Sequence, residues 1–187
     1  MRAFVAANLA IAHTRRAAEA AMHAKRTEGA PAARWSSPAK LHLTLRFLGS
    51  IDVGLAPAIA DVLRAKVEGR PAPRVAMGPI DAFPDVTRAL SIFLAVRDLD
   101  GDLRALRELV SSELDELGFP SDPRPFVPHL TIARVREPAD LRPWLASTPP
   151  SELGEARVTE VVLYRSDRAT GEYVALESVA LALPARR

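Results

Sequence analysis

The sequence contains no cysteine, only three lysines among its 25 basic residues, and no apolar run long enough to cross a membrane. Without cysteine the chain has no disulfide framework, no thiolate metal ligand and no cysteine nucleophile, so any chemistry falls to His, Ser, Thr or carboxylates. Residues 1–7 form too short an apolar run for a secretory leader. We therefore expect a cytoplasmic protein that does not associate with membranes.

The scarcity of lysine leaves 22 arginines (25 − 3) in a chain whose formal net charge is only +2. The planar guanidinium of arginine can hold phosphate with two parallel hydrogen bonds, which favours a phosphate-bearing partner. The arginines are nevertheless spread along the chain, as codon bias in a GC-rich genome would also produce. Charge alone therefore does not identify a partner.

The 187 residues suit one large domain, since they are too few for two ordinary independent domains. Hydrophobic residues make up 48% and charged residues 26%, a balance that is typical of a globular chain with a buried core. We treat residues 1–187 as a single domain.

Hydrophobic periodicity, glycine and proline divide the chain into strands and amphipathic helices. Strands are expected at 2–9 and 41–48, in a hairpin of 74–82 and 89–96, at 128–135, and in a hairpin of 156–164 and 173–183. Helices are expected at 10–28 and 55–68, between Gly101 and Gly118, and at 139–146. This order indicates an α+β fold with antiparallel sheets and helices packed outside.

The strand at 41–48 alternates apolar and polar side chains, so its two faces differ. Alternation places four residues on the apolar face, namely Leu41, Leu43, Leu45 and Phe47. It places His42, Thr44 and Arg46 on the other face, which is rich in groups that bind phosphate. Phe47 is therefore expected in the core.

A tetrapeptide pattern occurs twice, as His42-Leu43-Thr44-Leu45 and His129-Leu130-Thr131-Ile132. The two copies are 87 residues apart (129 − 42), almost half the chain. A single His-x-Thr is more often a structural polar pair, but two copies at this spacing suggest two equivalent lobes about a pseudo-two-fold axis. Each lobe would bring one motif to a shared cleft.

Two histidines in one cleft suit the cleavage of a phosphodiester. The reaction needs a base to activate the incoming oxygen and an acid to protonate the leaving oxygen, on opposite sides of phosphorus. Histidine, with an ordinary pKa of about 6.5, can fill both roles near neutral pH. Thr44 and Thr131 lie two residues after the histidines, on the same strand faces, where their hydroxyls can donate to phosphate oxygens.

Neither motif histidine has a neighbour at a recurrent metal-ligand spacing, so we expect no metal. The other two histidines, His13 and His23, fall in the first expected helix without a threonine two positions on. They are expected to be surface residues or residues at the flank of the helix.

At these motifs the sequence resembles the bacterial and archaeal RNA 2′,3′-cyclic phosphodiesterases, long called 2′-5′ RNA ligases, within the two-histidine phosphoesterase superfamily. The resemblance runs along nearly the whole chain, through residues 2–6, 34–35, 41–49, 82–84, 117–119, 124–135 and 161–166. It implies a bilobal fold with a cleft between two antiparallel sheets. It also implies hydrolysis of a terminal 2′,3′-cyclic phosphate to a 2′-phosphate, without a cofactor.

By the resemblance, His42 is the proton donor to the departing 3′ oxygen and His129 the proton acceptor that activates water. Thr44, Thr131 and Arg134 bind the phosphate. Because the cleft is pseudo-symmetric, the two histidine roles could be exchanged. The expected partner is RNA or an oligonucleotide with a 2′,3′-cyclic phosphate end, and the expected state is a monomer.

Some residues outside the motifs are assigned on the pattern alone. Arg46 and Arg165 are expected to be solvated, with contact to a nucleic-acid backbone as the alternative. Many relatives have aspartate where this chain has Asn8, which leaves contacts at the edge of the substrate open.

Two other functions use the same residues. Reversible 2′-5′ joining of RNA runs the chemistry backwards, with a 5′-hydroxyl in place of water. A non-catalytic RNA-binding module would have lost a motif residue, and none is lost. The physiological substrate stays open among tRNA halves, oligonucleotide ends, small cyclic nucleotides and an ADP-ribose cyclic phosphate.

Overall fold

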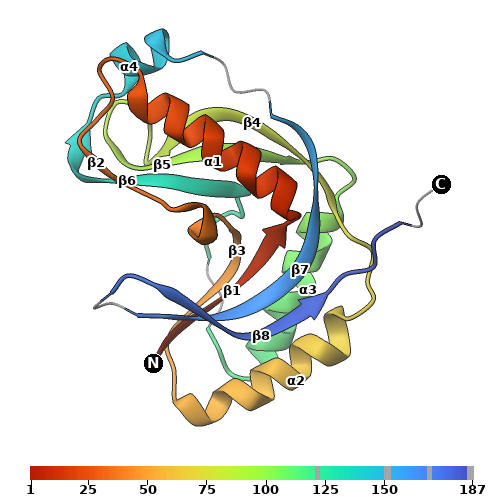
Figure 1. Ribbon diagram of the computed structural model, residues 1–187. Coiled ribbons are helices and arrows are strands. Elements are labelled where there is room, and N and C mark those ends of the chain that lie inside the picture. The colour runs from red at the N-terminus through yellow and green to blue at the C-terminus, as the bar shows by residue number, and fades with distance from the viewer. Residues whose placement is uncertain (121–122, 150–152, 168–169, 185–187) are drawn as a thin grey trace.

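The structure is a computed structural model, and it describes residues 1–120, 123–149, 153–167 and 170–184 (Figure 1). Its strands are β1 (Arg2–Leu9), β2 (Ala33–Trp35), β3 (Leu43–Ser50), β4 (Arg74–Phe83), β5 (Ala89–Asp98), β6 (His129–Ala139), β7 (Gly154–Ser166) and β8 (Tyr173–Ala180). Its α-helices are α1 (Ile11–Arg26), α2 (Ala56–Val67), α3 (Asp102–Glu116) and α4 (Arg142–Ser147). The predicted α+β element order is confirmed apart from the short strand β2, which is absent from the predicted order, and α4 is shorter than predicted because β6 continues to Ala139.

The named strands pair antiparallel in one sheet of order β1-β3-β6-β5-β4-β7-β8, with β2 added to β6. Strand β7 also pairs with β1, so six strands close a ring. Two groups remain recognisable in Figure 1, an upper one of β2, β4, β5 and β6 beside α1 and α4, and a lower one of β1, β3, β7 and β8 beside α2 and α3.

The sequence analysis expects two sheets, whereas these pairings join both groups into one. On one side of the ring β3 and β6 meet at a single residue pair, Leu43 and Leu130. On the other side the 13 residues of β7 are long enough to serve both groups: 154–157 pair with β4, and the remainder pairs with β1 and β8. The expectation of two separate sheets is therefore wrong, because the strands form one continuous sheet.

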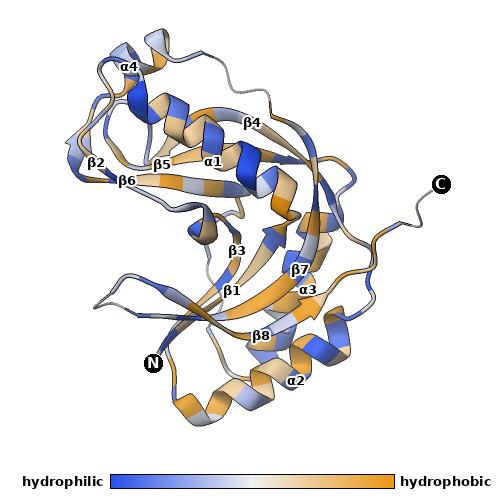
Figure 2. Ribbon diagram, viewed as in Figure 1, coloured by the Kyte–Doolittle hydropathy of each residue, from blue (hydrophilic) through white to orange (hydrophobic). Residues whose placement is uncertain are grey.

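The helices cover the sheet with apolar faces (Figure 2). The buried positions of α1 are alanines, namely Ala17, Ala21 and Ala24, which let the helix approach closely. Helix α3 buries larger side chains at helical spacing, namely Leu103, Leu106, Val110 and Leu114. Trp144 of α4 is buried, and its Nε1 donates to the carbonyl oxygen of Ala24 at 3.1 Å, which ties α4 to α1. Among the described residues, no helix is long and apolar enough to span a membrane.

Each motif strand carries a β-bulge three residues after its histidine. In β3, Thr44 is opposite Ala6 and Arg46 is opposite Val5, so Leu45 is an extra residue. In β6, Thr131 and Ala133 are opposite consecutive residues of β5, so Ile132 is extra in the same way. An inserted residue reverses the faces of those that follow it, because side chains alternate with period two.

The bulge at Leu45 overturns two expectations. Phe47 is not in the core: its side chain is 55% exposed and lines the central cleft. Arg46 is neither solvated nor available to nucleic acid, since it is only 2% exposed. Its Nη2 donates to Asp115 at 2.5 Å and to the carbonyl oxygens of Phe119 and Pro120 at 3.0 and 2.8 Å. Arg46 therefore fastens β3 to the end of α3.

Candidate active site

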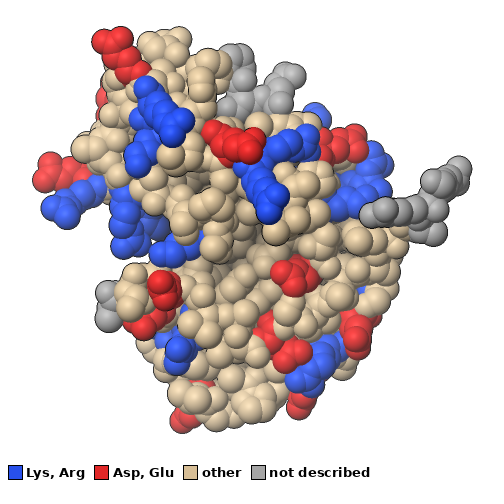
Figure 3. Space-filling view, in the orientation of Figure 1, with Lys and Arg blue, Asp and Glu red and all other residues tan. Residues whose placement is uncertain are grey.

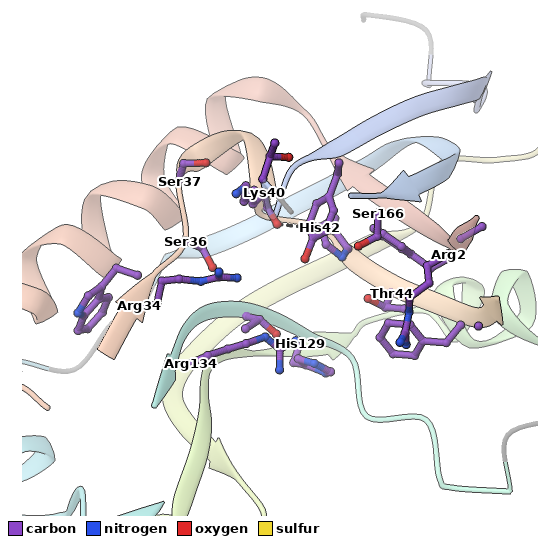
Figure 4. Close-up of a pocket in the computed structure, with 18 residues that line it drawn as sticks. Arg2, Arg34, Ser36, Ser37, Lys40, His42, Thr44, His129, Arg134 and Ser166 are labelled. Atoms are coloured by element: carbon purple, nitrogen blue, oxygen red, sulfur yellow. Dashed lines mark hydrogen bonds between the residues drawn. The ribbon is translucent and has the colours of Figure 1, made fainter. Parts of the chain in front are cut away.

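A cleft of about 340 Å³ lies between the two groups of strands. Every residue that the sequence analysis assigns to the site lines this cleft, namely His42, Thr44, His129, Thr131 and Arg134. Figure 4 shows His42, just before β3, and His129, at the start of β6, facing the same cavity. The two copies of the motif, distant in sequence, therefore share one site.

Both histidine rings are held by the same backbone contact. Nδ1 of His42 lies 2.8 Å from the carbonyl oxygen of Lys40, and Nδ1 of His129 lies 2.7 Å from that of Val127. A carbonyl oxygen can only accept, so Nδ1 must carry the proton in both rings. Nε2 of each ring is left as a proton acceptor when the ring is neutral and a donor when it is charged.

Aromatic rings enclose both histidines. Around His42, the ring centroids of Phe4, Tyr173 and Tyr164 lie at 5.0, 5.4 and 6.0 Å. Around His129, those of Phe83 and Phe93 lie at 5.0 and 5.1 Å. The sequence analysis did not identify these rings, because only strand pairing brings β1, β4, β5 and the β7–β8 hairpin beside the motifs.

The enclosure lowers the pKa of both histidines. Burial is the main cause for His42, whose pKa falls to about 4 although the hydrogen bond to Lys40 acts to raise it. The positive charge of Arg134, and that of His129 when it is protonated, lower it further. Burial also lowers the pKa of His129, with a smaller contribution from Arg134. Both rings are therefore neutral near pH 7, and each can accept a proton.

The lining of the cleft is cationic. Its charged members are Arg2, Arg34, Lys40 and Arg134, and no aspartate or glutamate stands among the described lining residues. In Figure 3, Lys and Arg gather at the left of the upper half, above the hollow between the halves. A cavity lined by one sign of charge concentrates ligands of the opposite sign, here anions.

The bulge at Ile132 brings Arg134 into this cavity. Strict alternation would have put Arg134 on the face opposite His129, and the sequence analysis assigned it to the site through the family resemblance. The extra residue puts Arg134 on the face of His129 and Thr131. Arg134 occupies the fifth position after its histidine, as Phe47 does after His42.

Comparison with known proteins identifies the family of the chain. A family model described as the 2′-5′ RNA ligase superfamily matches residues 11–170. The chain belongs to this superfamily.

Superfamily relatives with curated names point to a phosphoesterase. The chain is 28% identical over 137 residues to an RNA 2′,3′-cyclic phosphodiesterase of Methanothermobacter thermautotrophicus, covering 72% of this chain and 73% of the relative. It is 31% identical over 139 residues to a protein of the same name from Geobacillus stearothermophilus, covering 73% of this chain and 44% of the relative.

Solved structures share the fold along almost the full chain. The protein TT0787 of Thermus thermophilus is 27% identical with a TM-score of 0.78, covering 96% of this chain and 97% of that one. E. coli LigT, crystallised with 3′-AMP, is 24% identical with a TM-score of 0.75 and covers the same shares. The mixed α/β fold with its antiparallel sheet is thus the fold of these superfamily structures.

Two residues beside the motifs have other environments. Asn8 of β1 does not line the cleft, and its Nδ2 donates to Glu160 and to the Tyr164 hydroxyl, both at 2.8 Å. It therefore supports a ring that contacts His42. Arg165 is exposed, as expected, and lies outside the main cleft.

The described residues contain no group of three or more His, Cys, Asp or Glu side chains that could hold a metal ion. Metal independence stays a prediction for experiment. The groups that this superfamily cleft offers to a ligand are two imidazoles, two threonine hydroxyls and several cations.

Proposed function

We propose that the protein hydrolyses 2′,3′-cyclic phosphate at RNA ends to a 2′-phosphate, with His42 and His129 as a general acid and base that need no metal. The observation that carries the proposal is the matched pair of imidazoles. Each has Nδ1 fixed on a backbone carbonyl, Nε2 has no hydrogen-bond partner among the described residues, and both rings face one cation-lined cleft.

In this reaction one histidine takes a proton from water as the water oxygen bonds to phosphorus. The bond from phosphorus to the 3′ oxygen breaks, and the other histidine gives its proton to that oxygen. The product keeps the phosphate on the 2′ oxygen. The family resemblance makes His42 the donor and His129 the acceptor.

Burial lowers the pKa of both histidines, so either neutral ring can serve as the base. A bound phosphate anion raises the pKa of both rings, since it stabilises their charged forms. His42 and His129 titrate as a coupled pair, and mutation of each histidine combined with pH profiles assigns the acid and the base.

The remaining lining residues have supporting parts in the proposal. Thr44 and Thr131 donate hydroxyl hydrogen bonds to the non-bridging oxygens, and Arg134 neutralises their charge. Phe47, exposed at the other motif strand, offers a flat surface on which the terminal base stacks. The proposal includes a pseudo-two-fold, bilobal cleft, which the two bulges and the two matched imidazole contacts support.

A product assay separates hydrolysis from ligation. Cyclic-ended RNA is incubated with the protein, with and without a second RNA that carries a 5′-hydroxyl. We expect a linear 2′-phosphate in both reactions. A lengthened strand would instead favour reversible 2′-5′ joining, and binding without any product would favour a non-catalytic RNA-binding module.

A further inference from the structure

The cationic lining of the cleft extends beyond the residues that the proposed reaction uses. Arg34 of β2 is directly opposite Arg134 of β6, and both line the cleft. Backbones of paired strands are about 4.8 Å apart, and like charges placed opposite each other destabilise a sheet. Among the described residues, no carboxylate forms a salt bridge with Arg34. An anion bound between the two arginines would offset such repulsion.

Other donors surround Arg34. Ser36 and Ser37 follow it on the segment between β2 and β3, and both line the cleft, as does Lys40. In the described part of the chain neither serine hydroxyl has a hydrogen-bond partner, and the Lys40 ammonium lies over the Tyr173 ring, 6.0 Å from its centroid. These groups offer hydrogen bonds and positive charge to a ligand.

These donors lie at one end of the cleft. In Figure 4, Arg34, Ser36 and Ser37 lie on one side of His42, and Arg2 and Thr44 lie on the other. Phe47 follows Thr44 along β3, away from Arg34. The first end of the cleft thus carries Arg34 and two serine hydroxyls beside Trp35, and the second end carries Arg2, Thr44 and the exposed ring of Phe47.

We propose that Arg34, with Ser36, Ser37 and Lys40, forms a second phosphate subsite. It takes the phosphate on the 5′ oxygen of the nucleoside whose cyclic phosphate lies between the histidines. This inference rests on the proposed function, and it identifies the substrate class as nucleotides with a second anion. An unphosphorylated nucleoside 2′,3′-cyclic phosphate fills only part of the cleft.

The covalent structure of a nucleotide fits this division. The base is attached at C1′, next to the 2′ oxygen, whereas the 5′ carbon is attached at C4′, next to the 3′ oxygen. A cyclic phosphate held between the histidines therefore sends the base toward one end of the cleft and the 5′ phosphate toward the other. The exposed ring of Phe47 suits the base, and Arg34 with its two neighbouring serine hydroxyls suits the phosphate.

The direct test is binding without turnover. Dissociation constants are measured for adenosine 2′-phosphate, which has the form of the proposed product, and for adenosine 2′,5′-bisphosphate. We expect the bisphosphate to bind roughly 10- to 100-fold more tightly, as charge-assisted hydrogen bonds provide. Arg34→Ala should bring the two constants within about threefold, and Arg34→Lys should give an intermediate ratio because it keeps the charge without the planar fork.

Arg15→Ala is the matched control, because Arg15 is an exposed arginine of α1 outside the cleft. It should keep the wild-type ratio. Arg34→Gln is the second variant, with thermal unfolding as the check that each variant folds. Equal affinities of the wild-type protein for the two ligands, or an unchanged ratio in folded Arg34→Ala and Arg34→Gln proteins, would overturn the subsite.

Turnover then identifies the source of the second phosphate. The values of kcat/KM are compared for adenosine 2′,3′-cyclic phosphate, its 5′-phosphorylated form, and a dinucleotide whose 5′ phosphate is a phosphodiester. A higher kcat/KM for the dinucleotide indicates that the second phosphate belongs to an RNA strand, and a higher kcat/KM for the 5′-monoester indicates a small nucleotide. Either result supports the subsite. Equal kcat/KM values for the phosphorylated and unphosphorylated substrates would contradict it. Failure to hydrolyse all three would defeat the proposed function, while the binding ratio still decides the subsite.

Discussion

Strand β3, with His42 just before it, and strand β6 place the same groups in the cleft up to their bulges and different groups after them. His42 and Thr44 match His129 and Thr131, and each histidine donates Nδ1 to the carbonyl two residues earlier. Five residues after the histidines, one strand presents an aromatic ring and the other a guanidinium. Under the proposed function, the matched backbones supply the reacting groups, and the differing side chains distinguish the two ends of a substrate.

The two strands also differ one residue earlier, on the face away from the cleft. There β6 has Ala133, which packs in the core, and β3 has Arg46, which is buried on Asp115 and two carbonyls. The larger side chain ties its strand to α3. The difference at this position concerns stability rather than chemistry.

The largest expected effect on activity comes from the two histidines that the two motifs share. His42→Ala and His129→Ala should each lower kcat on cyclic-ended RNA by about 10²- to 10⁴-fold, because each removes one proton transfer. RNA binding should change little, since the cationic lining remains. A variant that keeps activity within tenfold of wild type would exclude the paired acid-base account.

Arg46→Ala should lower the free energy of unfolding by about 3 kcal/mol, because it removes a buried charge from its partners. Urea denaturation measures the change. Arg165→Ala, at an exposed position of β7, is the control and should stay within about 0.5 kcal/mol. Equal stability of the two variants would show that Arg46 does not fasten β3 to α3.

Arg134→Ala should lower kcat/KM by roughly 10- to 100-fold through lost phosphate contacts. It should also raise the pKa of His42 and His129, because the Arg134 charge lowers both. The acid limb of the pH profile, along which the base becomes protonated, should therefore move to higher pH. NMR titration of the two rings checks the direction, and a shift to lower pH is incompatible with this role.

Phe47→Ala should have the smallest effect, raising KM by about tenfold as one base-stacking contact is lost. Stability should stay nearly constant, since the ring is 55% exposed. Phe47→Tyr keeps a flat ring and should behave like wild type. If Phe47→Ala lowered stability without changing KM, Phe47 would contribute to packing rather than to base stacking.

These residues also mark how far the sequence predicts the structure. The element order and both His-x-Thr motifs follow from periodicity and repetition, and the structure brings the motifs into one cleft. Alternation fails after Leu45 because one bulged residue exchanges the faces of Arg46 and Phe47. A bulge depends on pairing with a partner strand, and local sequence carries no clear signal of it.

The aromatic shell is a second limit of sequence analysis. Phe4 and Phe93 belong to strands whose neighbours are known only from the sheet order, so their contacts with His42 and His129 could not be predicted. The joining of both strand groups into one sheet has the same origin. Long-range pairing, rather than local preference, decides these features.

The most direct test of the account is the reaction of cyclic-ended RNA in EDTA, followed by identification of the phosphate position in the product. We predict a 2′-phosphate from the wild-type protein at the same rate with and without EDTA, and no comparable product from His42→Ala or His129→Ala. Loss of activity in EDTA, a 3′-phosphate product, or turnover by either variant near the wild-type rate would contradict metal-free catalysis by the two histidines.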